Sequence, residues 1–152
     1  MKPYENQARK AAGEFVRGFA PWTWFFTLTF RRGVNAEHVE QAARDWLRII
    51  AREVVREHVP AAWGVECGAG GNWHVHGVLS IATGADVLKV AARHAWHARD
   101  DANGILDLQD YDPKRGGAGY AVKDGVWFLD TCCPRYPRCR RKGGCKEVGQ
   151  KR

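Results

Sequence analysis

Two histidines separated by one residue are the first chemically informative feature of the chain. They are His74 and His76, in the segment NWHVHGVLS (72–80). Alternate side chains of a β-strand point to the same face, so in a strand both imidazoles can reach one small ligand. Imidazole is a common ligand of divalent metal ions. The alternative is a pair of ordinary surface or core histidines, because this spacing often occurs by chance.

A glutamate that precedes the histidines completes a candidate metal site. The segment AAWGVEC (61–67) is also a predicted strand, and turn-forming glycines separate it from the histidines. A hairpin centred on Gly70 places Glu66 directly opposite His74, on the same face of the sheet. Two imidazoles and a carboxylate suit Mn²⁺, Mg²⁺ or Zn²⁺. We therefore expect Glu66, His74 and His76 to bind a divalent cation and to leave coordination positions open.

A tyrosine with a lysine beside it is the candidate nucleophile. Tyr120 and Lys123 lie three residues apart in GYAVKDG (119–125), so they share one face of a helix. A phenol is protonated at neutral pH, and a nearby ammonium or divalent cation favours the reactive phenolate. The alternative is a tyrosine that packs by its ring next to a surface lysine. Tyr111 is a rival nucleophile, but it ends a predicted strand and has no cation one helical turn away.

These residues need strands and helices to position them, and the hydrophobic pattern predicts both. WTWFFTLTF (22–30) alternates in the manner of a strand, and Asn35 is a predicted N-cap for a helix that ends before Pro60. The helix that carries Tyr120 is weakened by several glycines. The order β-α-β-β-α-β-α with one hairpin predicts an α+β fold, an antiparallel sheet with helices packed on it. The predicted strands are 22–30, 61–67, 73–81 and 104–111, and the predicted helices are 35–58, 85–99 and 112–123.

Positive charge is concentrated at the C-terminal end of the chain. Residues 131–152 hold eight of the 24 lysines and arginines and one of the 17 acidic residues, so the net charge of +7 belongs to this tail. The division predicts a folded domain at 1–130 and a basic tail at 131–152. A basic tail suggests a polyanion partner, although such tails are often simply solvated. The tail residues predicted to contact DNA are Arg135, Arg138, Arg140, Arg141 and Lys142.

Cysteines in the same tail raise the question of a structural zinc ion. No apolar run is long enough to cross a bilayer, and MKPYENQARKAAGEF lacks the apolar core of a signal peptide, so we expect no membrane association and reduced thiols. Four thiolates can bind Zn²⁺, but paired C-x-x-C knuckles are missing, and an unstructured tail is the alternative. The four candidate ligands are Cys132, Cys133, Cys139 and Cys145.

Three motifs, taken in order, resemble those of HUH endonucleases of the rolling-circle replication initiator (Rep) type. They are FTLTF (26–30), HVHGV (74–78) and YAVK (120–123), and the resemblance covers roughly residues 22–124. It implies an HUH/Rep-like nuclease domain that uses Mn²⁺ or Mg²⁺. The resemblance assigns Glu66, His74 and His76 as metal ligands, Tyr120 as the nucleophile, Lys123 as its charged helper, and Thr27 and Thr29 to a mainly structural first motif.

The resemblance also implies an activity, sequence-specific nicking and joining of single-stranded DNA. Tyr120 would attack the scissile phosphate, leaving a 5′-phosphotyrosine link and a free 3′ hydroxyl. Such a reaction initiates rolling-circle replication of a small plasmid or virus. The implied partners are single-stranded DNA at an origin hairpin or nick site and, since no helicase domain is present, a host helicase and polymerase. The expected location is the cytoplasm or nucleoid of a microbial host, or the nucleus of a eukaryotic one.

Other families and classes of function remain as alternatives. Conjugative relaxases place the tyrosine before the histidines, where only Tyr4 is available here. Single-tyrosine transposases of insertion sequences usually add a metal ligand one turn beyond the tyrosine, where this chain has Lys123 or Asp124. The Rep pattern therefore fits better. A non-catalytic DNA-binding protein and a metal-dependent hydrolase that uses water are the rivals from other classes.

Overall fold

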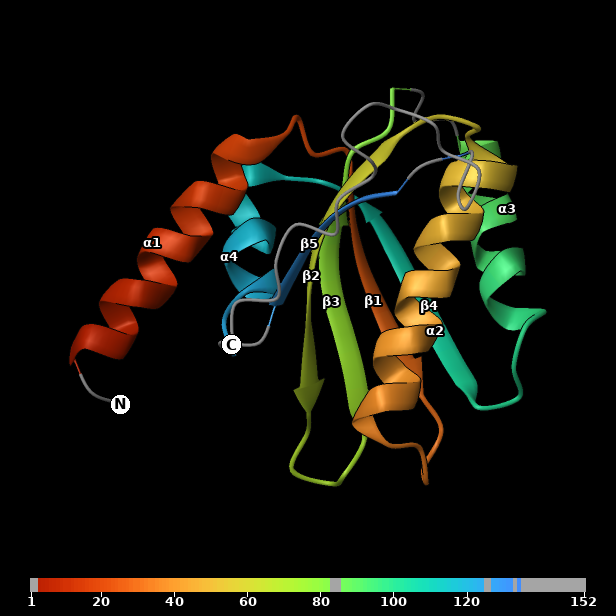
Figure 1. Cartoon of the computed structure of the whole chain (residues 1–152), viewed down its shortest axis with the longest axis horizontal. Helices are drawn as coiled ribbons and strands as arrows, with labels where there is room; N and C mark the ends of the chain where they lie inside the picture. The colour runs from red at the N-terminus through yellow and green to blue at the C-terminus, as the bar shows by residue number, and fades with distance from the viewer. Residues whose placement is uncertain (1–2, 83–85, 125–126, 133, 135–152) are drawn as a thin grey trace, which may run out of the picture.

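An antiparallel sheet of five strands is the centre of the structure (Figure 1). This computed structural model describes residues 3–82, 86–124, 127–132 and 134. The strand order is β4-β1-β3-β2-β5, so β3 is the central strand and β4 and β5 are the edges. The α+β class predicted from the sequence is confirmed. The strands are β1 (Trp24–Phe30), β2 (Val59–Cys67), β3 (Trp73–Leu79), β4 (Asn103–Asp110) and β5 (Trp127–Cys132).

Helices cover both faces of the sheet (Figure 1). Helices α2 (Ala36–Ile49) and α3 (Asp86–His97) bury one face, and α1 (Pro3–Phe19) and α4 (Gly117–Ala121) pack on the other. A π-helical turn, η1 (Ile50–Val54), continues α2, which begins at the predicted N-cap. Within the described residues, no helix combines the length and apolar character needed to cross a membrane.

The two faces have different cores because β1 and its neighbours alternate strictly. Trp24, Phe26 and Leu28 are fully buried in a large aromatic core beneath α2 and α3. The opposite face has a smaller core, which covers only part of the sheet and leaves room for polar residues beside it. The smaller core comprises Val16, Trp22, Ala62, Val78, Ala118, Val122 and Leu129.

The single helix predicted over 112–123 is wrong, because a glycine divides it. Asp112 caps a 3₁₀ turn, η2 (Pro113–Arg115), and Gly116 then takes a left-handed conformation with φ of 70°. Only afterwards does α4 begin, and it ends at Ala121. A left-handed residue cannot continue a right-handed helix, and glycine adopts it without a steric penalty. Tyr120 therefore lies on a short, separate helix.

Two elements, α1 and β5, were not predicted. Helix α1 packs on α4 through the smaller core. Strand β5 pairs with β2 and runs to Cys132, across the predicted domain boundary at residue 130, which stays a prediction. Asp130 ties β5 to the rest of the fold, since it pairs with Arg44 of α2 at 3.2 Å and accepts a hydrogen bond of 2.9 Å from Trp63 Nε1.

Candidate active site

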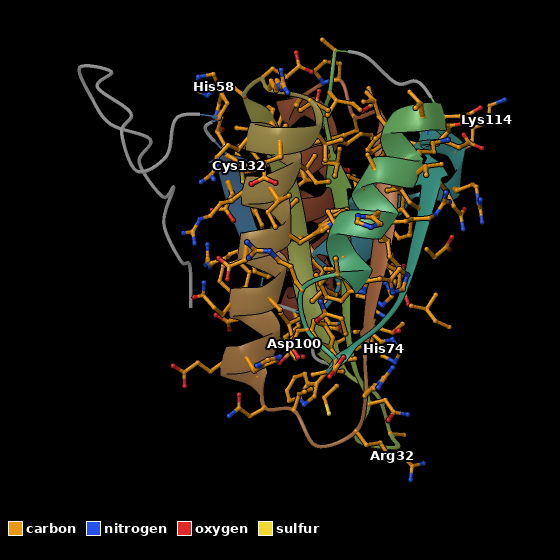
Figure 2. The ribbon with its side chains drawn as sticks, turned by 90° about the vertical axis from the view of Figure 1, so that its right-hand side faces the viewer. Arg32, His58, His74, Asp100, Lys114 and Cys132 are labelled. Carbon is orange, nitrogen blue, oxygen red and sulfur yellow. The ribbon has the colours of Figure 1, made fainter. Side chains whose placement is uncertain are left out.

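The predicted catalytic residues gather on the sheet face that α1 and α4 cover. In the β2–β3 hairpin, Glu66 pairs with His74 and Gly64 with His76, which confirms the predicted register. On the other side of β3, Thr27 of β1 lies opposite His76. His74 lies toward the end of the sheet where Arg32 is found, and Lys114 is at the opposite end (Figure 2). The polar part of the face thus follows the central strand away from the smaller core.

His76 is the most constrained side chain of the site. Its Nε2 lies 3.2 Å from Glu66 Oε2, and its Nδ1 shares a hydrogen bond of 3.0 Å with the Thr27 hydroxyl. Burial lowers the pKa of His76, and the positive charges of Lys123 and His74 act in the same direction, against the opposing effect of Glu66. The neutral imidazole, which is the form that binds a metal ion, is therefore favoured.

Lys123 lies just beyond α4 and reaches back to the carboxylate of β2. Its Nζ is 2.9 Å from Glu66 Oε2. The hydrogen bond from Lys123 lowers the pKa of Glu66 despite partial burial of the carboxyl group. Burial also acts to lower the pKa of Lys123, but hydrogen bonds to Tyr120 and Glu66 and the charge of Asp124 outweigh it, so that this pKa is raised. Both members of the pair therefore stay ionised near neutral pH.

Tyr120 lies beside these residues and remains accessible. Its ring meets the edge of the His76 ring at a centroid distance of 4.7 Å, and Lys123 Nζ lies 3.9 Å from the tyrosine ring centroid. The residue is 42% exposed. The close approach of α4 to β1 depends on Gly117, because a Cβ atom there would lie 2.8 Å from Cδ2 of Phe25. A glycine that weakens the helix thus allows the tyrosine to reach the histidine.

The donor atoms suit a divalent cation, but the side chains do not converge on one point. His74 stacks on His76 with nearly parallel rings whose centroids are 6.0 Å apart. In the part of the chain that the structure describes, no group of three His, Cys, Asp or Glu side chains is placed to hold one metal ion. Instead, Glu66 Oε2 contacts both His76 and Lys123. The shared face is as predicted, and the metal itself stays a prediction.

A cavity beside Tyr120 was not predicted. It has a volume of about 300 Å³, and Phe25, Gln109, Tyr111, Arg115 and Tyr120 are among its lining residues. The period-two pattern of the first strand signals that Phe25 shares a face with Thr27. Nothing in the sequence signals Arg115, because its position depends on the break at Gly116.

The predicted tail sites fall almost entirely outside the described residues. Cys132 alone among the predicted zinc ligands is described, and it lies in β5, partly buried against the larger core. The zinc ion and the DNA contacts of the tail stay predictions. Outside the described residues lie Cys133, Cys139, Cys145, Arg135, Arg138, Arg140, Arg141 and Lys142.

Comparison with known proteins gives one family. Residues 23–124 match the model of a family of replication-associated proteins, those of the ORF2 type. Comparisons with curated proteins and with solved structures give no match. The matched range contains β1 to β4 and α4, and it therefore includes every residue of the site described above.

Proposed function

Because the chain belongs to the family of replication-associated proteins of the ORF2 type, we propose that it nicks and rejoins single-stranded DNA to start replication of a small plasmid or virus. Membership supports a replication initiator of the rolling-circle type, as the sequence motifs predict. The contact between Tyr120 and His76, with ring centroids 4.7 Å apart, carries the chemical part of the proposal. It brings a phenol next to an imidazole, a carboxylate and an ammonium that come from distant segments.

In the proposed reaction, Tyr120 is the nucleophile. Its phenolic proton passes to solvent, which the exposed ring can reach. The phenolic oxygen then bonds to phosphorus, the bond from phosphorus to the 3′ oxygen breaks, and the departing oxygen takes a proton from water. The product is a 5′-phosphotyrosine with a free 3′ hydroxyl. One phosphodiester is exchanged for another, so the reverse reaction rejoins DNA without an external energy source.

Lys123 is the proposed electrostatic helper. Its ammonium lies 3.9 Å from the Tyr120 ring centroid, where it stabilises negative charge on the phenolate and on the attacked phosphate. The ion pair with Glu66 at 2.9 Å fixes the position of this charge. A fixed charge needs no reorganisation during the reaction, which is how preorganised sites lower barriers.

Glu66, His74 and His76 would hold the divalent cation, for which we propose Mn²⁺ or Mg²⁺. When bound, such an ion supplies positive charge that polarises the scissile phosphate. Thr27 would keep the His76 ring in place through its bond to Nδ1, so that Nε2 remains the ligand atom. The lowered pKa values of His76 and Glu66 favour the deprotonated forms that ligation requires.

The proposed partners follow from the reaction. They are single-stranded DNA at an origin hairpin or nick site, and a host helicase and polymerase that extend the free 3′ hydroxyl. Basic residues of the tail would add affinity for the DNA backbone without sequence preference.

A covalent adduct tests this function. The protein is incubated with Mn²⁺ and a random-sequence pool of single-stranded DNA labelled at the 3′ end, and then denatured. Attack at phosphorus leaves the 3′ fragment on the protein, so a labelled protein band is expected, and sequencing it gives the cleavage site. Tyr120→Phe should abolish the band, whereas Tyr4→Phe should retain it. A non-catalytic binding protein or a water-using hydrolase would produce no band.

A further inference from the structure

We propose that the cavity beside Tyr120 binds the nucleotide adjacent to the scissile phosphate, with Arg115 holding a phosphate group of that nucleotide. This inference rests on the proposed function, which it makes more specific. The cavity volume of about 300 Å³ lies at the small end of the range for ligand sites. Since Tyr120 and His76 both line it, a nucleotide seated there is next to the reacting atoms.

Arg115 supplies a cation that no carboxylate neutralises. Its Nη1 donates a hydrogen bond of 2.9 Å to Gln109 Oε1, and no ion pair joins Arg115 to any acid among the described residues. The two acids that line the cavity have other partners. Asp110 pairs with Lys89 Nζ at 2.7 Å, and Asp112 accepts from the backbone of the 3₁₀ turn that it caps. A guanidinium with unused donors at the wall of a cavity suits a phosphate.

Gln109 has a fixed orientation at the cavity wall. Its Nε2 donates to Asp107 at 2.6 Å while its Oε1 accepts from Arg115. These two bonds leave one amide N–H and one oxygen lone pair unused. One donor and one acceptor in fixed positions can recognise the edge of a base. Gln109 is therefore the residue through which this cavity would discriminate among bases.

Tyr111 provides independent support for a polar ligand. It lines the cavity, and its hydroxyl group is buried without a hydrogen-bond partner in the described part of the chain. Buried polar groups are nearly always satisfied, and leaving one unpaired costs free energy. A nucleotide carries polar atoms that can satisfy such a hydroxyl. The neighbouring aromatic rings of Phe25 and Tyr120 offer surfaces on which a base can stack.

The test compares two adjacent cations in the 3₁₀ turn. Arg115→Gln removes the charge that lines the cavity, and Lys114→Gln removes the same charge from an exposed neighbour that does not line it. Both changes are made in Tyr120→Phe, so that no adduct complicates equilibrium binding. The probe is a short, fluorescently labelled single-stranded DNA of random sequence. Arg115→Gln should weaken binding about tenfold, the loss expected for a specific arginine contact, and Lys114→Gln less than about twofold. Thermal melting checks that both variants fold.

Every result bears on either the cavity or the reaction. If the two variants bind equally well, or if neither weakens binding, the cavity proposal is wrong even when the wild-type chain forms an adduct. If only Arg115→Gln weakens binding while the wild-type chain gives no adduct, the cavity is supported and the proposed reaction fails. A further comparison uses catalytically active chains. Gln109→Ala should broaden the set of bases found next to the cleavage site in sequenced adducts, and unchanged sequences would remove its role in recognition.

Discussion

Lys123 Nζ lies 2.9 Å from Oε2 of Glu66 and 3.9 Å from the centroid of the Tyr120 ring. One ammonium thus contacts both the acid of the predicted metal set and the proposed nucleophile. The same carboxylate oxygen lies 3.2 Å from His76 Nε2. A divalent cation bound to Glu66 would share this oxygen with Lys123, so occupancy of the metal site and the position of the charge beside Tyr120 are linked.

Removal of the lysine charge should slow the reaction without stopping it. Lys123→Ala should reduce the rate of adduct formation about a hundredfold, because it removes electrostatic stabilisation but leaves the nucleophile intact. The rate is measured at saturating DNA by quenching into denaturant. Lys114→Ala, which removes an exposed cation of η2, is the control and should leave the rate unchanged. A Lys123→Ala rate equal to that of the wild-type chain would contradict the proposed role.

Removal of the metal should abolish cleavage. Excess EDTA should stop adduct formation, and Mn²⁺ or Mg²⁺ should restore it, because the acid and the two histidines are proposed to bind the ion that polarises the phosphate. Calorimetric titration with Mn²⁺ measures the site directly. His74→Ala should weaken Mn²⁺ binding about tenfold or more, and His97→Ala on α3 should not. Undiminished cleavage in EDTA would exclude the metal from the mechanism.

Two threonines of β1 separate orientation of the histidine from stability. Thr27→Val removes the hydroxyl bonded to His76 Nδ1, and Thr29→Val removes one that bonds to the backbone of Ile105. Each should lower the free energy of unfolding by about 1 kcal/mol. Only Thr27→Val should also slow adduct formation, about tenfold, because the imidazole loses its orienting partner. Urea denaturation and adduct rates measure the two effects, and equal rates for the two variants would show that Thr27 is structural only.

Two glycines of α4 test how closely the helix must approach the sheet. A Cβ atom at position 117 would lie 2.8 Å from Phe25 Cδ2, whereas one at position 119 meets nothing within 4 Å. Gly117→Ala should therefore destabilise the fold by about 1–3 kcal/mol through overpacking and reduce adduct formation. Gly119→Ala should be neutral or stabilise by up to about 1 kcal/mol through helix propensity. Thermal and urea denaturation distinguish them, and a harmless Gly117→Ala would contradict the packing of α4 on β1.

The register and the shared face of the site could be predicted because both depend on local pattern. Strict alternation in β1 and a glycine-rich turn at Gly70 are sufficient to place Glu66 opposite His74. The division of the last helix was missed because it depends on the left-handed conformation of Gly116. Helix α1 gave a weak signal, since Val16 is fully buried while Phe15 and Phe19 are exposed.

Side-chain convergence could not be predicted from spacing at all. The sequence places the carboxylate and both imidazoles on one face, but the choice of Lys123 as the partner of Glu66 depends on rotamers and on where α4 ends. The same limit applies to Arg44 and Asp130, which lie 86 residues apart in the chain and meet only because β5 pairs with β2.

The packing of α1 on α4 has a consequence for anyone who wishes to use this domain as a reagent. The family match covers residues 23–124, but Val16 before it and Leu129 after it belong to the same apolar cluster as Ala118 and Val122. A fragment cut at the borders of the match would expose the underside of the helix that carries Tyr120. The smallest self-sufficient unit is therefore longer than the recognisable one, and a fusion partner at the N-terminus is best joined ahead of α1.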